Sequence, residues 1–171
     1  SIRRRAAIIG GHNMDDYPLK MHVFNRARLI KNSKNRIPYG VDLIQKYKRE
    51  SWIVFTENKK QAKEFNKIIN TKGFKSALYN TDLDSAERLE NLNKFKKADL
   101  NVLVTCTALD EGFDMPEADG ALILSASSSK RQRVQRMGRV LRITENKPNA
   151  LIVTVYSSKT EFDKLMEEAK R

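Results

Sequence analysis

Residues 52–70 read WIVFTENKKQAKEFNKIIN, a short apolar run followed by a longer amphipathic one. The run from Trp52 to Phe55 is apolar throughout, which is typical of a strand that is buried on both faces. The following stretch, from Lys59 to Asn70, predicts a helix, and Gly73 is placed to end it as a C-terminal cap. Residues 52–70 therefore predict one strand–helix unit of a parallel sheet.

The same alternation of apolar and amphipathic stretches continues to the end of the chain. Strands that are apolar on both faces and separated by helices imply a parallel sheet that is covered on each side. We therefore predict an open, doubly wound α/β domain of five to six strands with helices on both faces. Further strands are expected at residues 76–79, 102–105, 121–124 and 151–155, and further helices from residue 84 and at about residues 129–143 and 159–170.

The helix that opens at Asp84 carries a capping signal. Glu87 follows three residues later, a spacing that fits a capping box. Leu89, Leu92 and Phe95 come next at helical spacing. These three side chains are expected on the inward face, where the helix packs on the sheet.

Residues 1–50 do not show this alternation of apolar and amphipathic stretches. Apolar and basic residues are mixed from Met21 to Ile37, and a helix is expected after them. We predict a connecting or packing segment at residues 1–50 and the α/β domain at residues 51–171. Because the chain begins with Ser1 rather than Met, we expect it to be part of a longer protein. The apolar residues of the helix in the first segment are Val41, Leu43, Ile44 and Tyr47.

Length and charge limit the class of protein. A chain of 171 residues is long enough for one domain with a proper core and too short for two. Its 33 basic residues outnumber its 21 acidic ones, and the resulting charge of +12 favours nucleic acid as a partner over a membrane surface. No apolar run approaches the roughly 18 residues of a membrane span, and no signal peptide opens the chain. We expect an intracellular protein, in the cytoplasm of a bacterial or phage-infected cell or in a nucleus.

Metal and thiol chemistry are not expected. The one cysteine, Cys106, cannot form an internal disulfide, and its place at the end of an apolar run predicts a small buried residue. His12 and His22 have no cysteine or second histidine at metal-binding spacing. The sequence therefore predicts no metal site.

Ligands of an open α/β sheet bind beyond the carboxyl ends of its strands, which directs attention to the loop at residues 106–117. This loop combines hydroxyl groups, a glycine and a carboxylate. Hydroxyl and backbone N–H groups suit phosphate oxygens, while a carboxylate beside a glycine suits sugar hydroxyls. The composition of the loop is thus suited to a nucleotide or nucleic acid.

The octet from Gln135 to Arg142, QRMGRVLR, is the most distinctive basic stretch. Its arginines recur at every third residue, and on a helix they lie opposite an apolar set that packs inward. The alternative is a solvated basic surface. Gly138 argues against that alternative, since glycine inside a solvated helix costs about 1 kcal/mol relative to alanine without any gain. The arginines are Arg136, Arg139 and Arg142, and the apolar set is Val134, Met137 and Leu141.

Together these stretches resemble the C-terminal RecA-like lobe of superfamily-2 helicases and translocases. The octet is similar to motif VI of that family, of the form Q-R-x-G-R-x-x-R. Residues 105–116 resemble motif V, in which a threonine ends a strand and a Gly-hydrophobic-Asp tripeptide follows. Residues 52–56 fit the motif IV strand, and the resemblance covers about residues 50–156. The Leu141-Arg142 ending is closer to the DNA-repair, restriction and bacteriophage branch than to the DEAD-box RNA helicases.

The resemblance implies a role for each position of the octet. Arg139 and Arg142 correspond to arginine fingers, which reach across a cleft to the γ-phosphate of ATP on a partner lobe. There they stabilise the charge that develops during phosphoryl transfer. Arg136 would brace the interdomain surface, and Gln135 would contact the nucleotide or the opposite lobe.

The resemblance assigns some positions at the strand ends and in the following loop to ATP and others to the nucleic acid. Asp114, with Gly112, resembles the position that meets the ribose of ATP. Thr56, Thr105 and Thr107 resemble positions that hold the nucleic-acid backbone through hydroxyl or neighbouring N–H groups, a contact that carries no sequence information. Simpler alternatives remain: Thr56 and Thr105 only end strands, and Asp114 only pins the turn that follows it.

The phosphate loop of an ATPase is absent, because no G-x-x-x-x-G-K-[ST] pattern occurs in the chain. Asp110-Glu111 lies inside the motif V match, which argues against a magnesium-binding acidic box. We therefore expect ATP and Mg²⁺ to be bound mainly by a partner lobe, and the chain alone to be inactive.

These features predict the second motor lobe of an ATP-dependent helicase or translocase. Its partners would be the N-terminal RecA-like lobe of the same protein and nucleic acid, DNA rather than RNA. One competing hypothesis is a stand-alone, non-catalytic nucleic-acid-binding domain, which leaves the arginine octet unexplained. Another is a regulatory lobe that supplies arginines in trans to a different NTPase.

Overall fold

The structure is a computed structural model, and it describes residue 33, residues 35–106, 117–124 and 150–159, and four later positions, which are Phe162, Asp163, Met166 and Glu167. The chain divides into two compact units, Ser1–Ile30 and Lys31–Arg171, and every described residue belongs to the second. Within the described ranges, no helix is both long enough and apolar enough to cross a bilayer.

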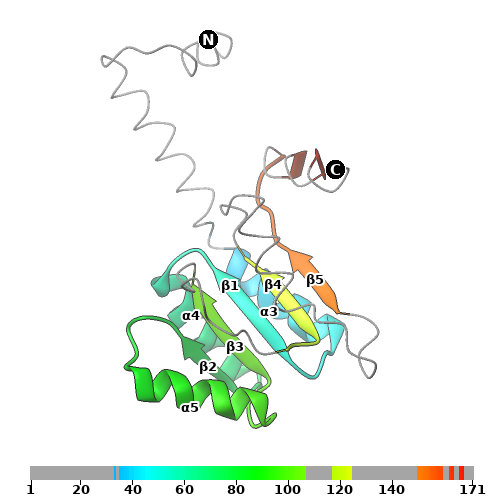
Figure 1. Cartoon of the computed structure of the whole chain (residues 1–171). Helices are drawn as coiled ribbons and strands as arrows, with labels where there is room; N and C mark the ends of the chain where they lie inside the picture. Colours follow the sequence, from blue (N-terminus) through cyan, green and yellow to red (C-terminus); the bar gives the residue numbers. More distant parts are fainter. Residues whose placement is uncertain are drawn as a thin grey trace, which may run out of the picture. The chain divides into compact units, whose positions relative to one another are not determined.

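One parallel sheet of five strands forms the centre of the second unit (Figure 1). The strand order is β2-β3-β1-β4-β5, and every neighbouring pair is parallel. The predicted open parallel sheet is confirmed, and the expected strand bounds differ from the observed ones by at most one residue. The strands are β1 (Trp52–Thr56), β2 (Ser76–Tyr79), β3 (Val102–Cys106), β4 (Gly120–Ile123) and β5 (Leu151–Thr154).

The central strand β1 is buried at all five positions, because the core extends over both faces of the sheet. Successive side chains of a strand point to opposite faces. Trp52 and Val54 accordingly belong to one apolar cluster, whereas Ile53 and Phe55 belong to a second. This division explains why the strand carries no polar residue before Thr56.

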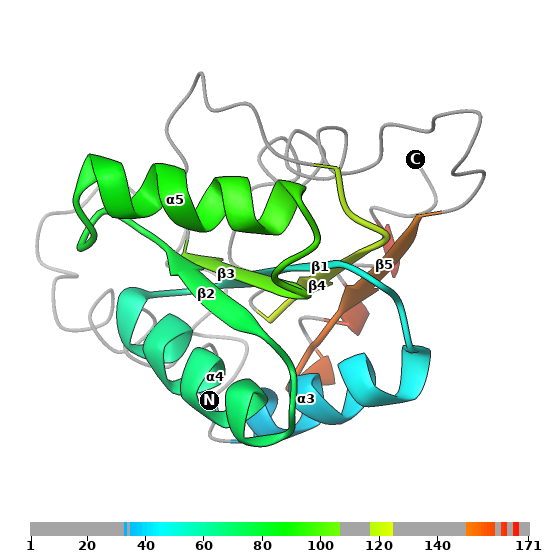
Figure 2. The same ribbon diagram turned by 90° about the horizontal axis from the view of Figure 1, so that it is seen from below.

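Helices cover both faces of the sheet, as predicted (Figure 2). α3 (Arg36–Tyr47) and α4 (Lys59–Thr71) lie on the face of the first cluster, to which both contribute buried apolar side chains. α5 (Ser85–Lys96) lies on the opposite face with the second cluster. The sheet is therefore the middle layer of three.

α3 belongs to the same core as the sheet. Ile37, Val41 and Ile44 are at most 4% exposed and pack in the cluster that contains Trp52. Their spacing of four and three residues places them on one side of the helix. The compact unit thus begins ahead of the boundary that the sequence placed at residue 50, because the packing of α3 makes this helix part of the domain.

Both ends of α4 are capped, and the cap at Gly73 is the one that the sequence predicts. The Asn58 side chain accepts a hydrogen bond from the Gln61 N–H at 3.0 Å, which satisfies one of the free donors of the first turn. At the other end, the Gly73 N–H donates to the Asn70 carbonyl at 3.1 Å. Gly73 has a φ of 87°, a conformation that favours glycine over any other residue.

The prediction for α5 is correct at its start and wrong at one position of its inward face. The Asp84 side chain caps the helix by accepting from the Glu87 N–H at 2.7 Å. Leu92 and Phe95 are buried, but Leu89 is 57% exposed. Steps of three residues drift by about 60° each around a helix, so Leu89 lies about 120° away from Phe95. That angle carries it out of the buried side.

The end of the chain is described in part. Lys159, Phe162, Asp163, Met166 and Glu167 are helical, as expected for the helix predicted at residues 159–170. The Phe162 ring lies 5.0 Å from the ring of Tyr156. The helix predicted at residues 129–143 lies outside the described residues.

Candidate functional site

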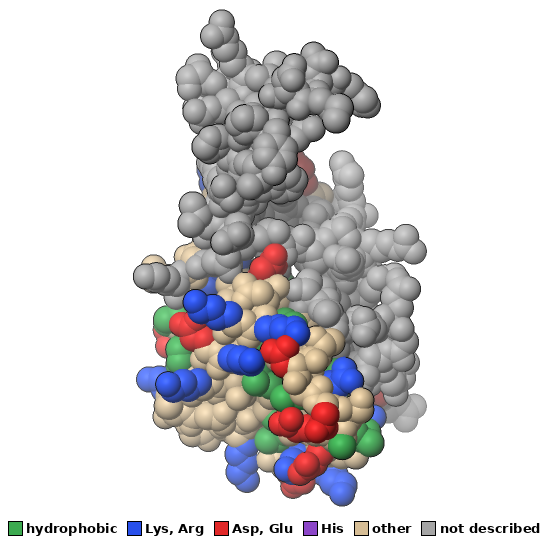
Figure 3. Space-filling model, turned by 90° about the vertical axis from the view of Figure 1, so that its left-hand side faces the viewer, with side chains coloured by type: hydrophobic (Ala, Val, Ile, Leu, Met, Phe, Trp, Pro, Cys, Tyr) green, Lys and Arg blue, Asp and Glu red, His purple; other side chains and the backbone are tan. Residues whose placement is uncertain are grey.

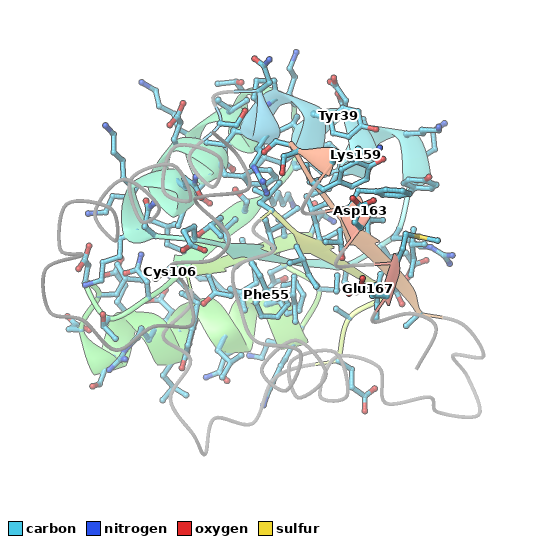
Figure 4. All side chains as sticks on the ribbon, turned by 90° about the horizontal axis from the view of Figure 1, so that it is seen from above. Tyr39, Phe55, Cys106, Lys159, Asp163 and Glu167 are labelled. Carbon is cyan, nitrogen blue, oxygen red and sulfur yellow. The ribbon has the colours of Figure 1, made fainter. Side chains whose placement is uncertain are left out.

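The carboxyl ends of the five strands meet at one edge of the sheet, because all neighbouring strands are parallel. Thr56 of β1 lies beside Cys106 of β3 in the strand register. On the other side of β1, Leu124 donates its N–H to the Phe55 carbonyl at 2.9 Å. Phe55 and Cys106 are labelled near the ends of these strands in Figure 4. Since open α/β sheets bind ligands beyond this edge, it is the candidate site.

Thr56 and Thr105, two of the predicted site residues, are brought together at this edge. They are 2% and 1% exposed. Thr56 Oγ1 lies 3.1 Å from the Thr105 carbonyl oxygen and 3.2 Å from that of Asn58, and Thr105 Oγ1 lies 3.2 Å from the Cys106 carbonyl oxygen. A hydroxyl has one proton, so it cannot donate to a phosphate while it donates to a carbonyl. In this arrangement the two threonines tie β1 to β3.

The turn between β1 and α4 is held by side chains of its own. Besides the Asn58 cap, the Gln61 side chain reaches back and accepts from the Glu57 N–H at 3.1 Å. Gln61 is only 7% exposed, although it is polar and lies in the first turn of a helix. The sequence did not single out this glutamine, which fixes the path of the chain as it leaves β1.

Two lysines of α4 converge on one carboxylate after β2. Lys63 Nζ lies 3.0 Å from Asp82 Oδ2, and Lys59 forms an ion pair with the other oxygen. Basic and acidic side chains are interspersed over the face shown in Figure 3. Because exposed ion pairs contribute little to stability and charge runs of this kind are usually solvated, we interpret these lysines as part of a solvated face.

The lysine pair has a measurable effect on Asp82. Hydrogen bonds from Lys59 and then Lys63 lower the pKa of Asp82 below its ordinary value. We expect an NMR titration to show a depressed midpoint for this carboxyl, and the double substitution K59M/K63M to raise it. The ion pairs contribute stability above the unfolded-state pKa, and this contribution is lost as pH falls through the folded-state pKa.

The matched control for this titration is Lys60→Met, which removes a neighbouring lysine that forms no ion pair with Asp82 among those that the structure describes. This control should leave the Asp82 midpoint where it is in the native chain. Equal midpoints in the native chain and in K59M/K63M would contradict the assignment.

Arg36 is a buried residue at the same edge that sequence reasoning missed. It is 2% exposed, and its Nη1 donates to the carbonyl of Leu124 at 2.6 Å and to that of Val155 at 3.0 Å. Its Nη2 donates to Ser157 Oγ at 2.7 Å. A signal was available, because Arg36 precedes buried Leu43 by seven residues and so lies on the same side of the helix.

Most of the predicted site residues lie outside the described ranges. Thr107, Gly112 and Asp114 fall within residues 107–116, and Gln135, Arg136, Arg139 and Arg142 fall within residues 125–149. Their roles stay predictions. Cys106 is 5% exposed, which confirms that it is a small buried residue.

The sequence of this chain matches the profile of a known protein family. The sequence profile of a family described as "Helicase conserved C-terminal domain" matches residues 35–144. The match begins at the start of α3 and runs through both the residue 105–116 loop and the arginine octet. It therefore covers the described sheet up to β4 and every predicted site residue.

Proteins of known name share part of their length with this chain. The DNA 3'-5' translocase XPB2 of Sulfurisphaera tokodaii is 36% identical over 129 residues, which cover 75% of this chain and 28% of that protein. The UvrABC system protein B of Fusobacterium nucleatum is 31% identical, over 69% of this chain and 19% of that protein. The ATP-dependent rRNA helicase RRP3 of Scheffersomyces stipitis is 26% identical, over 69% and 24%. The chain thus spans less than a third of each relative.

Solved structures share the fold. The C-terminal domain of the DEAD-box protein Dbp5 superposes with a TM-score of 0.71 at 22% identity, over 82% of this chain and 79% of that one. The helicase domain of Hef from Pyrococcus furiosus superposes with a TM-score of 0.59 at 23% identity, over 80% and 28%. These likenesses confirm the predicted RecA-like fold.

Proposed function

This chain belongs to the helicase C-terminal domain family, and from that premise we propose that it is the second motor lobe of an ATP-dependent nucleic-acid helicase or translocase. In this role it supplies arginine fingers to an ATP site formed with another lobe, and it contributes one half of a track for the nucleic-acid backbone. The observation that carries the proposal is the extent of the family match, which includes the loop at residues 105–116 and the arginine octet as well as the sheet.

The strand order supports the proposed ATP contacts. Residues 107–116 follow β3 and residues 125–149 follow β4, and these two strands flank β1 on either side. Both segments therefore follow strands whose carboxyl ends lie at the same edge of the sheet, with only β1 between them. The residues proposed to contact the nucleotide are Gly112 and Asp114 from the first segment and Gln135, Arg136, Arg139 and Arg142 from the second.

The hydrogen-bond donors of this chain decide which contacts to ATP we assign to it and which to the other lobe. Guanidinium groups suit phosphate oxygens, and Arg139 and Arg142 are proposed to stabilise the charge that develops on the γ-phosphate. ATP with Mg²⁺, when bound, supplies the phosphoryl group that is transferred. The chain has no phosphate loop, so most contacts to the phosphates and to Mg²⁺ are assigned to the other lobe.

We propose DNA rather than RNA as the nucleic acid. The charge of +12 favours a polyanion, and the relative that is 36% identical is named a DNA translocase, whereas RRP3 is named an rRNA helicase. Thr56, Thr105 and Thr107 are proposed to lie along the track. Because the hydroxyls of Thr56 and Thr105 bond to carbonyls, these two residues would act by fixing the strand ends whose neighbouring N–H groups meet the phosphates.

ATP hydrolysis by the full-length protein tests this proposal. We expect single-stranded DNA to stimulate hydrolysis, and an RNA strand of the same sequence to stimulate it less. The chain on its own should not hydrolyse ATP, because it lacks the phosphate loop. DNA binding without any stimulation would favour the stand-alone nucleic-acid-binding domain. Stimulation of a different NTPase by the added chain would favour the regulatory lobe.

A further inference from the structure

One buried cation takes no part in the proposed contacts to ATP or nucleic acid. Arg36 is the first residue of α3, where the positive end of the helix dipole disfavours a cation, and it is 2% exposed. Burial of a guanidinium also costs free energy unless its donors are satisfied. The bonds from the two Nη atoms of Arg36 to two carbonyls and one hydroxyl offset part of this cost.

The Arg36 side chain joins the two chain segments that directly follow β4 and β5, just beyond the last backbone hydrogen bond between these strands. The last ladder-type bond here runs from the Val155 N–H to the Ile123 carbonyl, at 2.8 Å. Nη1 then bonds to the carbonyls of both Leu124 and Val155, which follow β4 and β5 directly. The two N–H groups of Nη1 lie in the plane of the guanidinium and so hold these acceptors in fixed relative positions, whereas the three donors of an ammonium rotate about its stem.

Leu124 is the last described residue before the segment that carries the octet. We infer that Arg36 is a positioning residue for ATP hydrolysis: by fixing Leu124, it sets the point from which the chain proceeds to Arg139 and Arg142. This inference rests on the proposed function of the octet. Misplacement of a catalytic group by about 1 Å can lower a rate by about 100-fold, so a small shift at this anchor has a measurable consequence.

Two substitutions test the inference in the full-length protein. Arg36→Lys keeps the charge but loses the fork, and we expect it to lower the DNA-stimulated kcat about tenfold, within the range for a misplaced catalytic group. Ser157→Ala removes the hydroxyl that accepts from Nη2, leaves the two carbonyl bonds of Nη1 in place, and should lower kcat by a smaller factor. The KM for ATP and the affinity for DNA should both stay within about twofold, because neither residue is assigned a contact with a ligand. Should Arg36→Lys fail to fold, Ser157→Ala provides the same test.

Ile44→Val is the matched control, because Ile44 is buried on the same helix and touches neither strand end through a hydrogen bond. With rates expressed per folded molecule, this variant should retain the native kcat. A double-substitution cycle then separates positioning from general destabilisation. In an Arg139→Lys/Arg142→Lys background, Arg36→Lys should cause little further loss if it acts through these two arginines, whereas independent effects would multiply.

The outcomes are distinguishable from those of the proposed function. If Arg139→Ala is inactive but folded Arg36→Lys and Ser157→Ala turn over within about twofold of the native rate, the inference is wrong and the proposed function stands. Loss of kcat that multiplies fully in the Arg139→Lys/Arg142→Lys background also overturns it. If Arg139→Ala retains native turnover, the proposed function fails, and the inference fails with it.

Discussion

Arg139→Ala should lower the DNA-stimulated ATPase rate of the full-length protein by about 10³- to 10⁵-fold, the range over which arginine fingers act. The reason is electrostatic: the guanidinium would meet charge that develops on the γ-phosphate only in the transition state. The KM for ATP should change much less than kcat. Steady-state hydrolysis at saturating DNA measures this effect.

Arg142→Ala should have an effect of the same kind, and Arg133→Ala provides the control. Arg133 lies two residues ahead of the octet and outside the motif, so its loss should leave kcat nearly native. DNA binding, measured by fluorescence anisotropy, should be largely intact in all three variants. Near-native turnover of Arg139→Ala would rule out the finger assignment.

Trp52→Ala should lower the free energy of unfolding by about 3–5 kcal/mol, the usual cost of removing a large buried aromatic side chain. Trp52 is 0% exposed in the central strand. Its ring covers Gly120 of β4, where a Cβ would lie 2.6 Å from Trp52 Cε3. Since Gly120 has no side chain to move into the space, the cavity would remain open.

Trp52→Phe is the matched control for this loss. The indole Nε1 is buried without a hydrogen-bond partner in the described part of the chain, so phenylalanine removes an unsatisfied donor while it keeps most of the ring. Urea denaturation followed by circular dichroism measures both variants, because the chain has no second tryptophan to report by fluorescence. Equal losses for Trp52→Phe and Trp52→Ala would contradict this account of the site.

Much of the fold could be predicted because its signals are local. β1 is apolar up to Thr56 and β3 up to Thr105, and such apolar runs indicate strands that are buried on both faces. The predicted caps at Asp84 and Gly73 act within three residues of their own position. Leu89 was misplaced because three apolar residues at steps of three are compatible with more than one centre for the buried side of a helix.

Part of the candidate site could likewise be predicted from local patterns, and part could not. The arginine octet and the loop at residues 105–116 were recognisable as patterns, since the family match covers both. The hydroxyl bonds of Thr56 and Thr105 were not, because a threonine at the end of a strand can face a ligand or a neighbouring carbonyl. The Thr56 bond that decides between these alternatives joins residues 49 positions apart.

By itself, the sequence determined the class of fold, the positions of the five strands and of α4 and α5, and the family to which the chain belongs, because apolar spacing, caps and motifs are properties of short stretches. Only the tertiary structure decided that β1 lies between β3 and β4, and that α3 is part of the core. It also decided the partners of Arg36, whose bonds reach 88 and 119 residues along the chain. Contacts over such distances depend on how the strands are ordered in the sheet, and no local pattern records that order.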